Sequence, residues 1–369
     1  WGPLILLMVL AMISLQFLLH RQWAVHEQLS YPVAQVASNF CDMKGSGGRG
    51  VPDIFKNRLF RWGFVPVFLL LLIEYLAIRY PSSVPSIAES MPDFKRWTLP
   101  VTTKIPILRN VPDVWCLNTQ TIYFTIVGLS FFVSSEVSLT LGLAPILLAI
   151  FGSFYFLGTG TALQSSSIIT SRTGAYVGFA IVLFYTGRHY YLSVLGRAIG
   201  IKRKKKNRED GDEHDWGDDV SVLAARVLIL SFIGFTIVLS WMCQSWVIAI
   251  FYSLMLMILY LVISRIVCES GIPFVQCNWE PAPILLKLLG PAAFGPKPMT
   301  FSLWSTGILA QDPRESLMPY VATGIKLSDD AGLKLKRVFY IVVAAVVVAL
   351  VVAFLSSTYS LYNYKSTSD

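Results

Sequence analysis

The sequence predicts an all-α fold: a polytopic transmembrane helical bundle of about eight spans, with membrane-dipping or interfacial broken segments. Hydrophobic residues make up 54% of the 369 residues and charged residues only 14%, against roughly 25% charged residues in soluble proteins. The mean hydropathy is +0.60. The apolar runs are long and continuous, whereas a membrane β-barrel would need short alternating strands. These observations exclude an ordinary soluble globule, a disordered chain and a barrel.

Each predicted span is an apolar run near the length of about twenty residues that crosses a bilayer. We treat residues 1–369 as a single transmembrane domain. The connecting segments 21–61, 80–120, 197–218 and 268–336 are predicted to be extramembrane or re-entrant, since prolines interrupt the longest of them repeatedly. The predicted spans are residues 2–20, 62–78, 121–140, 143–158, 174–195, 221–242, 245–267 and 337–355.

The stretch Thr121–Gly158 is apolar apart from one formal charge, Glu136. Its length predicts a helical hairpin that turns near Gly142 and Pro145. A charged side chain at the centre of a membrane helix costs roughly 2.5 to 3.5 kcal/mol. Glu136 is therefore expected to have a partner, a proton or a water-filled cavity.

The distribution of Lys and Arg predicts the orientation. The formal net charge is +8, and residues 21–61, 197–218 and 265–337 hold 6, 7 and 8 of the basic residues, whereas residues 80–120 hold 4. Because basic loops stay in the cytoplasm, these three connections are predicted to be cytoplasmic in an integral plasma (inner) membrane protein. The run IKRKKKNR, residues 201–208, fits a topology signal or contact with anionic lipid better than nucleic-acid binding, so no nucleic acid is expected.

The sequence offers no motif for a metal, another cofactor or catalysis. Its 5 cysteines form no CxxC pair, and no His-x3–5-His companion accompanies them. Neither a GxSxG nor an HExxH sequence is present, and the 4 histidines are scattered. We therefore expect no metal, no cofactor and no enzymatic activity.

Polar residues within apolar stretches are the candidate site. Ser134, Ser135 and Ser138 accompany Glu136 on the predicted hairpin, where the alternative is that they only tighten helix packing. Short, broken hydrophobic segments at corresponding places are typical of transporter sites. Two such segments are EQLSYPVAQVASNF, which contains Gln35, and ESGIPFVQCNWEP. The second contributes Glu269, Gln276 and Asn278; for both, the alternative is an interfacial amphipathic helix or a surface loop.

The stretches RQWAVHEQLSYPVAQ, FFVSSEVSLTL, RTGAYVGFAIVLFYTGRHYYLSVLGRA, ESGIPF and DPRESLMPY together resemble an uncharacterised bacterial family of polytopic membrane proteins. That family is distantly similar to the oligopeptide transporter (OPT) superfamily, whose pattern the element LSYPVAQ resembles. The resemblance implies a longer protein, of which this chain is an internal portion. It also implies a transporter-like helical fold with internal repeats and membrane-dipping hairpins.

The expected function is secondary transport of a small polar solute, such as a peptide or a metal chelate, coupled to H⁺ or Na⁺. Glu136 is the predicted coupling residue, and the other candidates line the solute path. The alternative is a scaffold or accessory subunit that transports nothing. The expected partners are the lipid bilayer, the solute and its coupling ion, and a homo-oligomer or larger membrane complex.

Overall fold

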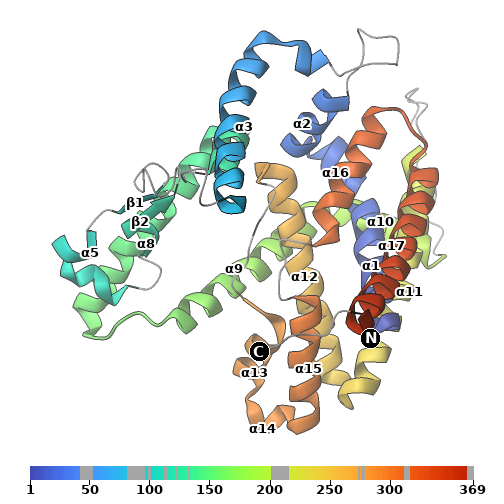
Figure 1. The fold of residues 1–369 in the computed structure, drawn as a ribbon. Coiled ribbons are helices and arrows are strands. Elements are labelled where there is room, and N and C mark those ends of the chain that lie inside the picture. Colours follow the sequence, from blue (N-terminus) through green and yellow to red (C-terminus); the bar gives the residue numbers. More distant parts are fainter. Residues whose placement is uncertain are drawn as a thin grey trace. The chain divides into compact units, whose positions relative to one another are not determined.

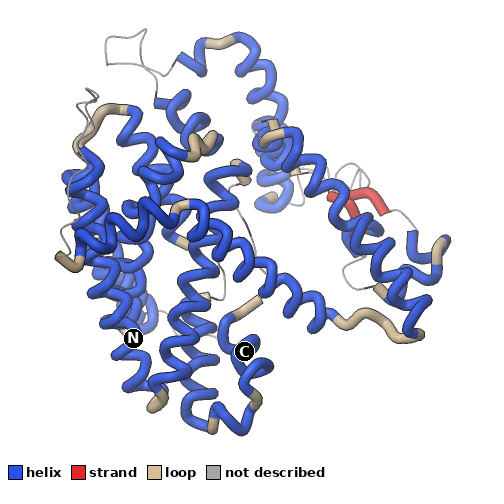
Figure 2. Tube along the Cα trace, turned by 180° about the vertical axis from the view of Figure 1, so that it is seen from behind, coloured by secondary structure: helices blue, strands red, loops and turns tan. Residues whose placement is uncertain are grey.

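A computed structural model confirms the all-α fold class (Figure 2). Helices dominate, and the only strands in the described part of the chain are β1 (Arg96–Thr98) and β2 (Thr119–Thr121). They pair antiparallel, with Trp97 opposite Gln120. The structure describes residues 1–41, 53–80, 96–98, 101–111, 115–121, 123–131, 133–200, 216–272, 275, 279–310 and 316–363.

The chain forms two compact units, which are described separately. Unit 1 comprises Trp1–Ser30, Thr173–Cys268 and Phe274–Asp369, and unit 2 comprises Tyr31–Arg172 and Glu269–Pro273. That the two make up the predicted single transmembrane domain stays a prediction. Unit 1 contains α1 (Gly2–Arg21), η1 (Gln22–His26), most of α9 (Ser165–Thr186), α10 (Arg188–Ala198), α11 (Trp216–Cys243), α12 (Trp246–Ser270), α13 (Pro281–Leu289), α14 (Pro291–Phe294), α15 (Pro296–Leu309), α16 (Leu317–Asp330) and α17 (Leu335–Asn363).

The core of unit 1 is built around α1, whose most extensive neighbour is α11, and α17 lies beside both helices (Figure 1). Near the C-terminal end of α1, Phe17 shares one apolar cluster with Val220 of α11 and Phe339 of α17. The rings of Phe17 and Phe339 pack edge to face at 5.1 Å. Because the start of α11 and the start of α17 meet the end of α1, both helices run antiparallel to α1.

Unit 2 holds α2 (Pro32–Cys41), η2 (Asp53–Lys56), α3 (Arg58–Arg79), α5 (Val101–Lys104), η3 (Pro106–Asn110), α6 (Trp115–Asn118), α7 (Phe124–Ser130) and α8 (Ser135–Thr159), besides β1 and β2. The main neighbour of α8 is η3. Leu108 and Val111 pack there against Ala149 of α8. α8 and the end of η3 approach each other closely at Gly152, where an added Cβ would lie 2.7 Å from the side chain of Val111.

Seven helices in the described residues are long and apolar enough to cross a membrane, and the chain is accordingly a membrane protein. They are Gly2–His26, Arg58–Arg79, Ser135–Thr159, Ser165–Thr186, Val220–Cys243, Trp246–Ser270 and Leu335–Asn363. All seven overlap spans predicted from the sequence. The predicted span 174–195 is divided, because Gly187 separates α9 from α10.

The predicted hairpin in Thr121–Gly158 is wrong. Residues 135–159 form one continuous helix, α8, which passes through both Gly142 and Pro145. The break lies earlier, after the short helix α7. Proline removes one backbone N–H, but a membrane helix tolerates it where neighbours satisfy the freed carbonyl. Glycine and proline therefore do not mark a turn here.

Candidate functional site: buried charges on the first helix

Four polar side chains lie in the protein interior along α1 and the turn that follows it. We call Gln16, His20, Gln22 and Glu27 the α1 polar row. Gln16 and His20 are 0% and 3% exposed, although α1 is among the helices that can cross a membrane. Buried polar groups need partners, because an unpaired one costs about 1–3 kcal/mol. The residues that bond to the α1 polar row are therefore part of the candidate site.

Gln16 and His20 bond to two different helices. The Oγ of Ser264 on α12 donates to the Oε1 of Gln16 at 3.0 Å. The Nε2 of His20 lies 3.2 Å from the Oδ2 of Asp329 on α16. This hydrogen bond, more than the partial burial that opposes it, lowers the pKa of Asp329 from its ordinary value. Position 20 follows position 16 by four residues, so the two side chains occupy one face of α1.

Each of these two side chains also has a second polar atom that is buried without a protein partner. These atoms are the Nε2 of Gln16 and the Nδ1 of His20. If the Nε2 of His20 carries the proton that it shares with Asp329, its Nδ1 is an acceptor. A buried acceptor and a buried amide donor on one helix face are suited to a water molecule or a polar ligand.

The row also contains an ion pair, between Glu27 and Arg265 of α12. Only 15% and 10% of their side chains are exposed. The Nε2 of Gln22 donates to the Oε1 of the same carboxylate at 3.1 Å. The guanidinium of Arg265 also lies 5.3 Å from the ring centre of Trp23, an arrangement in which the ring quadrupole attracts the cation.

The end of α1 has an unusual backbone that presents Glu27. The N–H of Glu27 donates to the carbonyl of Gln22 at 2.9 Å, five residues earlier, which makes η1 a π-helical turn. Gln28 then has φ +50°, a left-handed conformation that costs a non-glycine residue about 1–2 kcal/mol. π-helical turns and backbone strain are both enriched at functional sites.

Two tyrosines of α10 enclose this region. The hydroxyl of Tyr190 lies within hydrogen-bonding distance of the carbonyl of Leu18 and the Oγ of Ser221, at 3.2 and 3.0 Å. Tyr191 is 5% exposed. Burial first, and then the nearby Glu27 carboxylate, raise the pKa of the Tyr191 phenol. This phenol therefore stays protonated beside the ion pair.

In unit 2, two helix breaks meet. The break after α1 is followed by Pro32, the first residue of α2, and the break after α12 contains Gly271, with φ +77°. A Cβ on Gly271 would lie 2.7 Å from the Cβ of Pro32. Glycine is required here both by its conformation and by this close approach. The two broken segments predicted from the sequence, residues 27–40 and 269–281, contain these breaks.

The structure places the predicted hairpin residues at the start of α8. Ser134 is the N-cap, and its side chain accepts a hydrogen bond from the N–H of Val137 at 3.4 Å. Glu136 is exposed in the first helical turn, where the helix dipole favours an acidic residue. Ser135 and Ser138 are also exposed. Helix capping thus explains Ser134 and the helix dipole explains Glu136, and the place of all four residues in a solute path stays a prediction.

The other predicted residues lie on different elements. Gln35 is exposed on α2, and Glu269 is exposed near the end of α12. Because α8 packs mainly against η3 and α6, its contacts do not bring Gln35 or Glu269 close to Glu136. Gln276 and Asn278 lie outside the described residues.

Glu27 and Arg265 are not among the residues predicted from the sequence. Glu27 opens the broken segment EQLSYPVAQVASNF, of which only Gln35 is a predicted site residue. Arg265 stands inside the predicted span 245–267. The available signal is a pair of opposite charges, Glu27 shortly after the predicted span 2–20 and Arg265 near the end of the span 245–267, since charges at membrane depth pair with one another. In the described part of the chain, no three His, Cys, Asp or Glu side chains are grouped as metal ligands would be.

Comparison with known proteins gives one match. A model of a protein family, described as a family of unknown function (DUF6785), matches residues 1–369. No curated protein and no solved structure matches the chain significantly.

Proposed function

The chain belongs to the family of unknown function DUF6785, and from its own geometry we propose that it is a membrane transport protein for a small polar solute. The observation that carries the proposal is the Glu27–Arg265 ion pair. Charges inside membrane helices are costly and mark solute or ion pathways by default. Here both charges precede breaks in their helices, as is typical of secondary transporters with discontinuous helices.

Two other residues of the α1 polar row, Gln16 and His20, support the same proposal. Two buried polar atoms, on Gln16 and His20, have no protein partner and are available to a solute or to water. The His20–Asp329 hydrogen bond adds a second pair of groups that can exchange a proton. We infer that the solute is a peptide or a metal chelate, and that H⁺ or Na⁺ drives its movement. The OPT-like relationship remains part of this proposal.

In the proposed mechanism, the ion pair changes its partners during transport. In this structure Glu27 and Arg265 neutralise each other. A solute with a carboxylate would compete for Arg265, and a proton or cation would neutralise the released Glu27. A buried ion pair leaves an uncompensated charge when one partner is removed, so the exchange is coupled: solute and cation bind together.

Uptake into proteoliposomes tests this proposal. Purified protein would be reconstituted, and labelled alanine di- and tripeptides or a nickel–histidine chelate supplied under an inward H⁺ or Na⁺ gradient. We expect gradient-driven uptake that Glu27→Gln and Arg265→Gln reduce at least tenfold. Glu280→Gln is the matched control, since Glu280 is exposed in unit 1, and it should leave uptake unchanged. Equal uptake by Glu27→Gln and the original protein would refute the mechanism.

Glu136→Gln forms a separate arm of the same experiment. Loss of gradient-driven uptake in a folded Glu136→Gln protein would support its role in ion coupling. Unchanged uptake would leave Glu136 with its favourable position at the helix dipole, in the first turn of α8.

A scaffold without transport activity is the second candidate. One observation favours it: two members of the α1 polar row have partners in this structure, Arg265 for Glu27 and Asp329 for His20. A scaffold would purify from mild detergent in stoichiometric complex with other membrane proteins. It would also keep that complex in a Glu27→Gln/Arg265→Gln double variant. A transporter would drive uptake without added subunits.

A further inference from the structure

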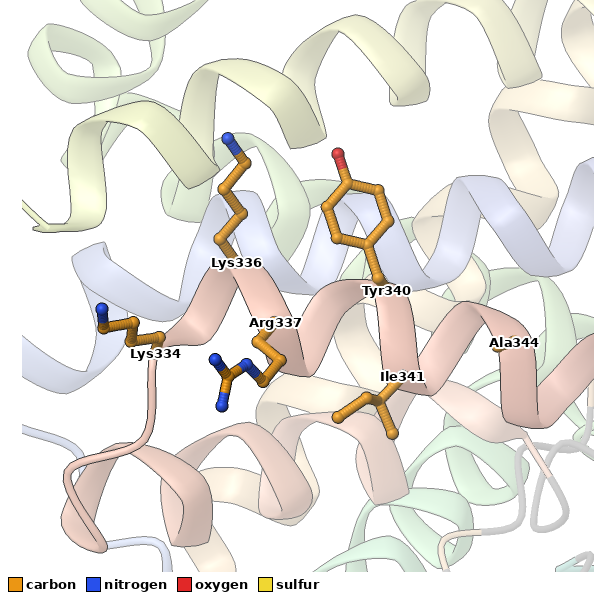
Figure 3. Close-up of a pocket in the computed structure, with 6 residues that line it drawn as sticks. All are labelled: Lys334, Lys336, Arg337, Tyr340, Ile341 and Ala344. Atoms are coloured by element: carbon orange, nitrogen blue, oxygen red, sulfur yellow. The ribbon is translucent and has the colours of Figure 1, made fainter.

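The start of α17 carries a surface hollow that the transport proposal does not use (Figure 3). Its volume is about 480 Å³, and its lining residues are Lys334, Lys336, Arg337, Tyr340, Ile341 and Ala344. We propose that this hollow binds an anionic phospholipid of the surrounding bilayer, with the phosphate at the basic residues and an acyl chain along the aliphatic ones.

The two faces of α17 differ. Val338 and Phe339 are buried in the cluster that joins α17 to α1 and α11. Tyr340 and Ile341 are 53% and 59% exposed. At 100° per residue, the lining residues lie on the side of the helix opposite to the packed side. The hollow therefore opens on the face of α17 that is turned away from the core of unit 1.

The order of residue types along this face matches the polarity profile of a phospholipid. The cations come first, Tyr340 follows one turn later, and Ile341 and Ala344 come after it. Lys336 and Ala344 are about 12 Å apart along the axis at 1.5 Å per residue, the scale of a lipid headgroup and its first acyl carbons. Tyrosine is enriched at this boundary because its ring is apolar and its hydroxyl is polar.

The side chains have the geometry of a headgroup site. In Figure 3, Lys336 and Tyr340 extend toward one side of α17, whereas Arg337 and Ile341 point away from them. An ammonium, a guanidinium and a phenol together offer hydrogen-bond donors to phosphate oxygens. Basic residues directly beside a membrane helix attract anionic lipid by about 1 kcal/mol each.

Neighbouring acidic residues are bonded to other groups. The Nζ of Lys326 donates to the Oδ1 of Asp330 at 2.7 Å, and Asp329 bonds to His20. Among the described residues that line the hollow, three are basic and none is acidic, so its lining carries positive charge. Zwitterionic lipids carry no net charge, so the complementary partner is an anionic lipid.

Lipid binding to the purified full chain tests the proposal. The probes are nanodiscs of phosphatidylcholine alone or with 30% phosphatidylglycerol, together with native mass spectrometry of retained lipid. We expect selective retention of phosphatidylglycerol. The double variant Lys336→Gln/Arg337→Gln should lower its affinity about 30-fold, which corresponds to about 1 kcal/mol for each lost cation.

Two further variants and one competitor make the result decisive. Lys287→Gln/Lys297→Gln removes the same charge from exposed positions on α13 and α15, and it should leave retention unchanged. Lys336→Arg/Arg337→Lys keeps the charge and should retain the lipid. Equal losses in both Gln double variants, retention of phosphatidylcholine at the same level, or displacement by millimolar inorganic phosphate would overturn the proposal.

Discussion

At the scale of single residues, the Glu27–Arg265 ion pair gives the clearest prediction about stability. Either Glu27→Gln or Arg265→Gln leaves one charge without its partner in a place where the side chains are at least 85% buried. Breaking a buried pair costs about 3–5 kcal/mol, whereas replacing both partners costs much less. We therefore expect the double variant to unfold at a higher denaturant concentration than either single variant. Additive losses in detergent-solubilised protein would contradict this coupling.

The His20–Asp329 hydrogen bond predicts a specific dependence of stability on pH. It lowers the pKa of Asp329 in the folded protein, so it stabilises the fold above the unfolded pKa of about 3.9. The stabilisation is lost as the pH falls through the lower folded pKa. Thermal unfolding between pH 6 and pH 3 should show a smaller acid-induced drop in Tm for Asp329→Asn. An identical drop in both proteins would show that Asp329 contributes nothing to acid sensitivity.

At the scale of elements, Gly142 distinguishes the continuous helix α8 from the predicted hairpin. Gly142 is inside α8, and an added Cβ would meet nothing within 4 Å. Gly142→Ala should therefore stabilise the protein by up to about 1 kcal/mol. Gly271→Ala should destabilise it by at least about 1–2 kcal/mol, because φ is +77° and Pro32 occupies the Cβ position. Destabilisation by Gly142→Ala in thermal unfolding would favour a turn.

The membrane helices could be predicted from the sequence because their signal is compositional. Runs of apolar residues predict α1, α3, α11 and α12, and the start of α17, within a few residues. The continuity of α8 through Gly142 and Pro145 is harder to predict, since glycine and proline break helices in water but are tolerated inside membranes. The α1 polar row could not be assembled, because its partners come from α12 and α16 and are 238 and 309 residues distant. Without those contacts, the sequence indicates Glu136, which is the one formal charge in a long apolar stretch. It gives no comparable signal for Glu27.

At the scale of the whole molecule, the positions of the helix ends in unit 1 can be compared with the membrane orientation predicted from the basic connections. The C-terminal end of α1 meets the N-terminal ends of α11 and α17, and Gln16 near that end bonds to Ser264 near the C-terminal end of α12. The connections attached to these four ends are the ones that carry most Lys and Arg. This arrangement supports a common side for all three, as the positive-inside rule requires.

The same arrangement constrains the number of crossings. The chain must cross the membrane an even number of times between the end of α1 and the start of α11. Three helices in the described part of that stretch are long and apolar enough to cross: α3, α8 and α9. The least apolar of the three is α9, and it contains Arg172. We therefore infer one of two arrangements. Either α9 does not span the membrane, which leaves two crossings, or one further segment spans it in addition to α3, α8 and α9, which gives four.

Single-cysteine labelling tests the common side. Ile199 at the end of α10, Leu333 before α17 and Trp246 at the start of α12 are 68%, 57% and 69% exposed. Each would be changed to cysteine in a protein whose 5 native cysteines are replaced by alanine. A membrane-impermeant maleimide should label Trp246→Cys in intact cells, and Ile199→Cys and Leu333→Cys only in inverted vesicles. Labelling of Ile199→Cys and Leu333→Cys from opposite sides would contradict the antiparallel packing of α11 and α17 against α1. Labelling of both in intact cells would reverse the orientation but preserve their common side.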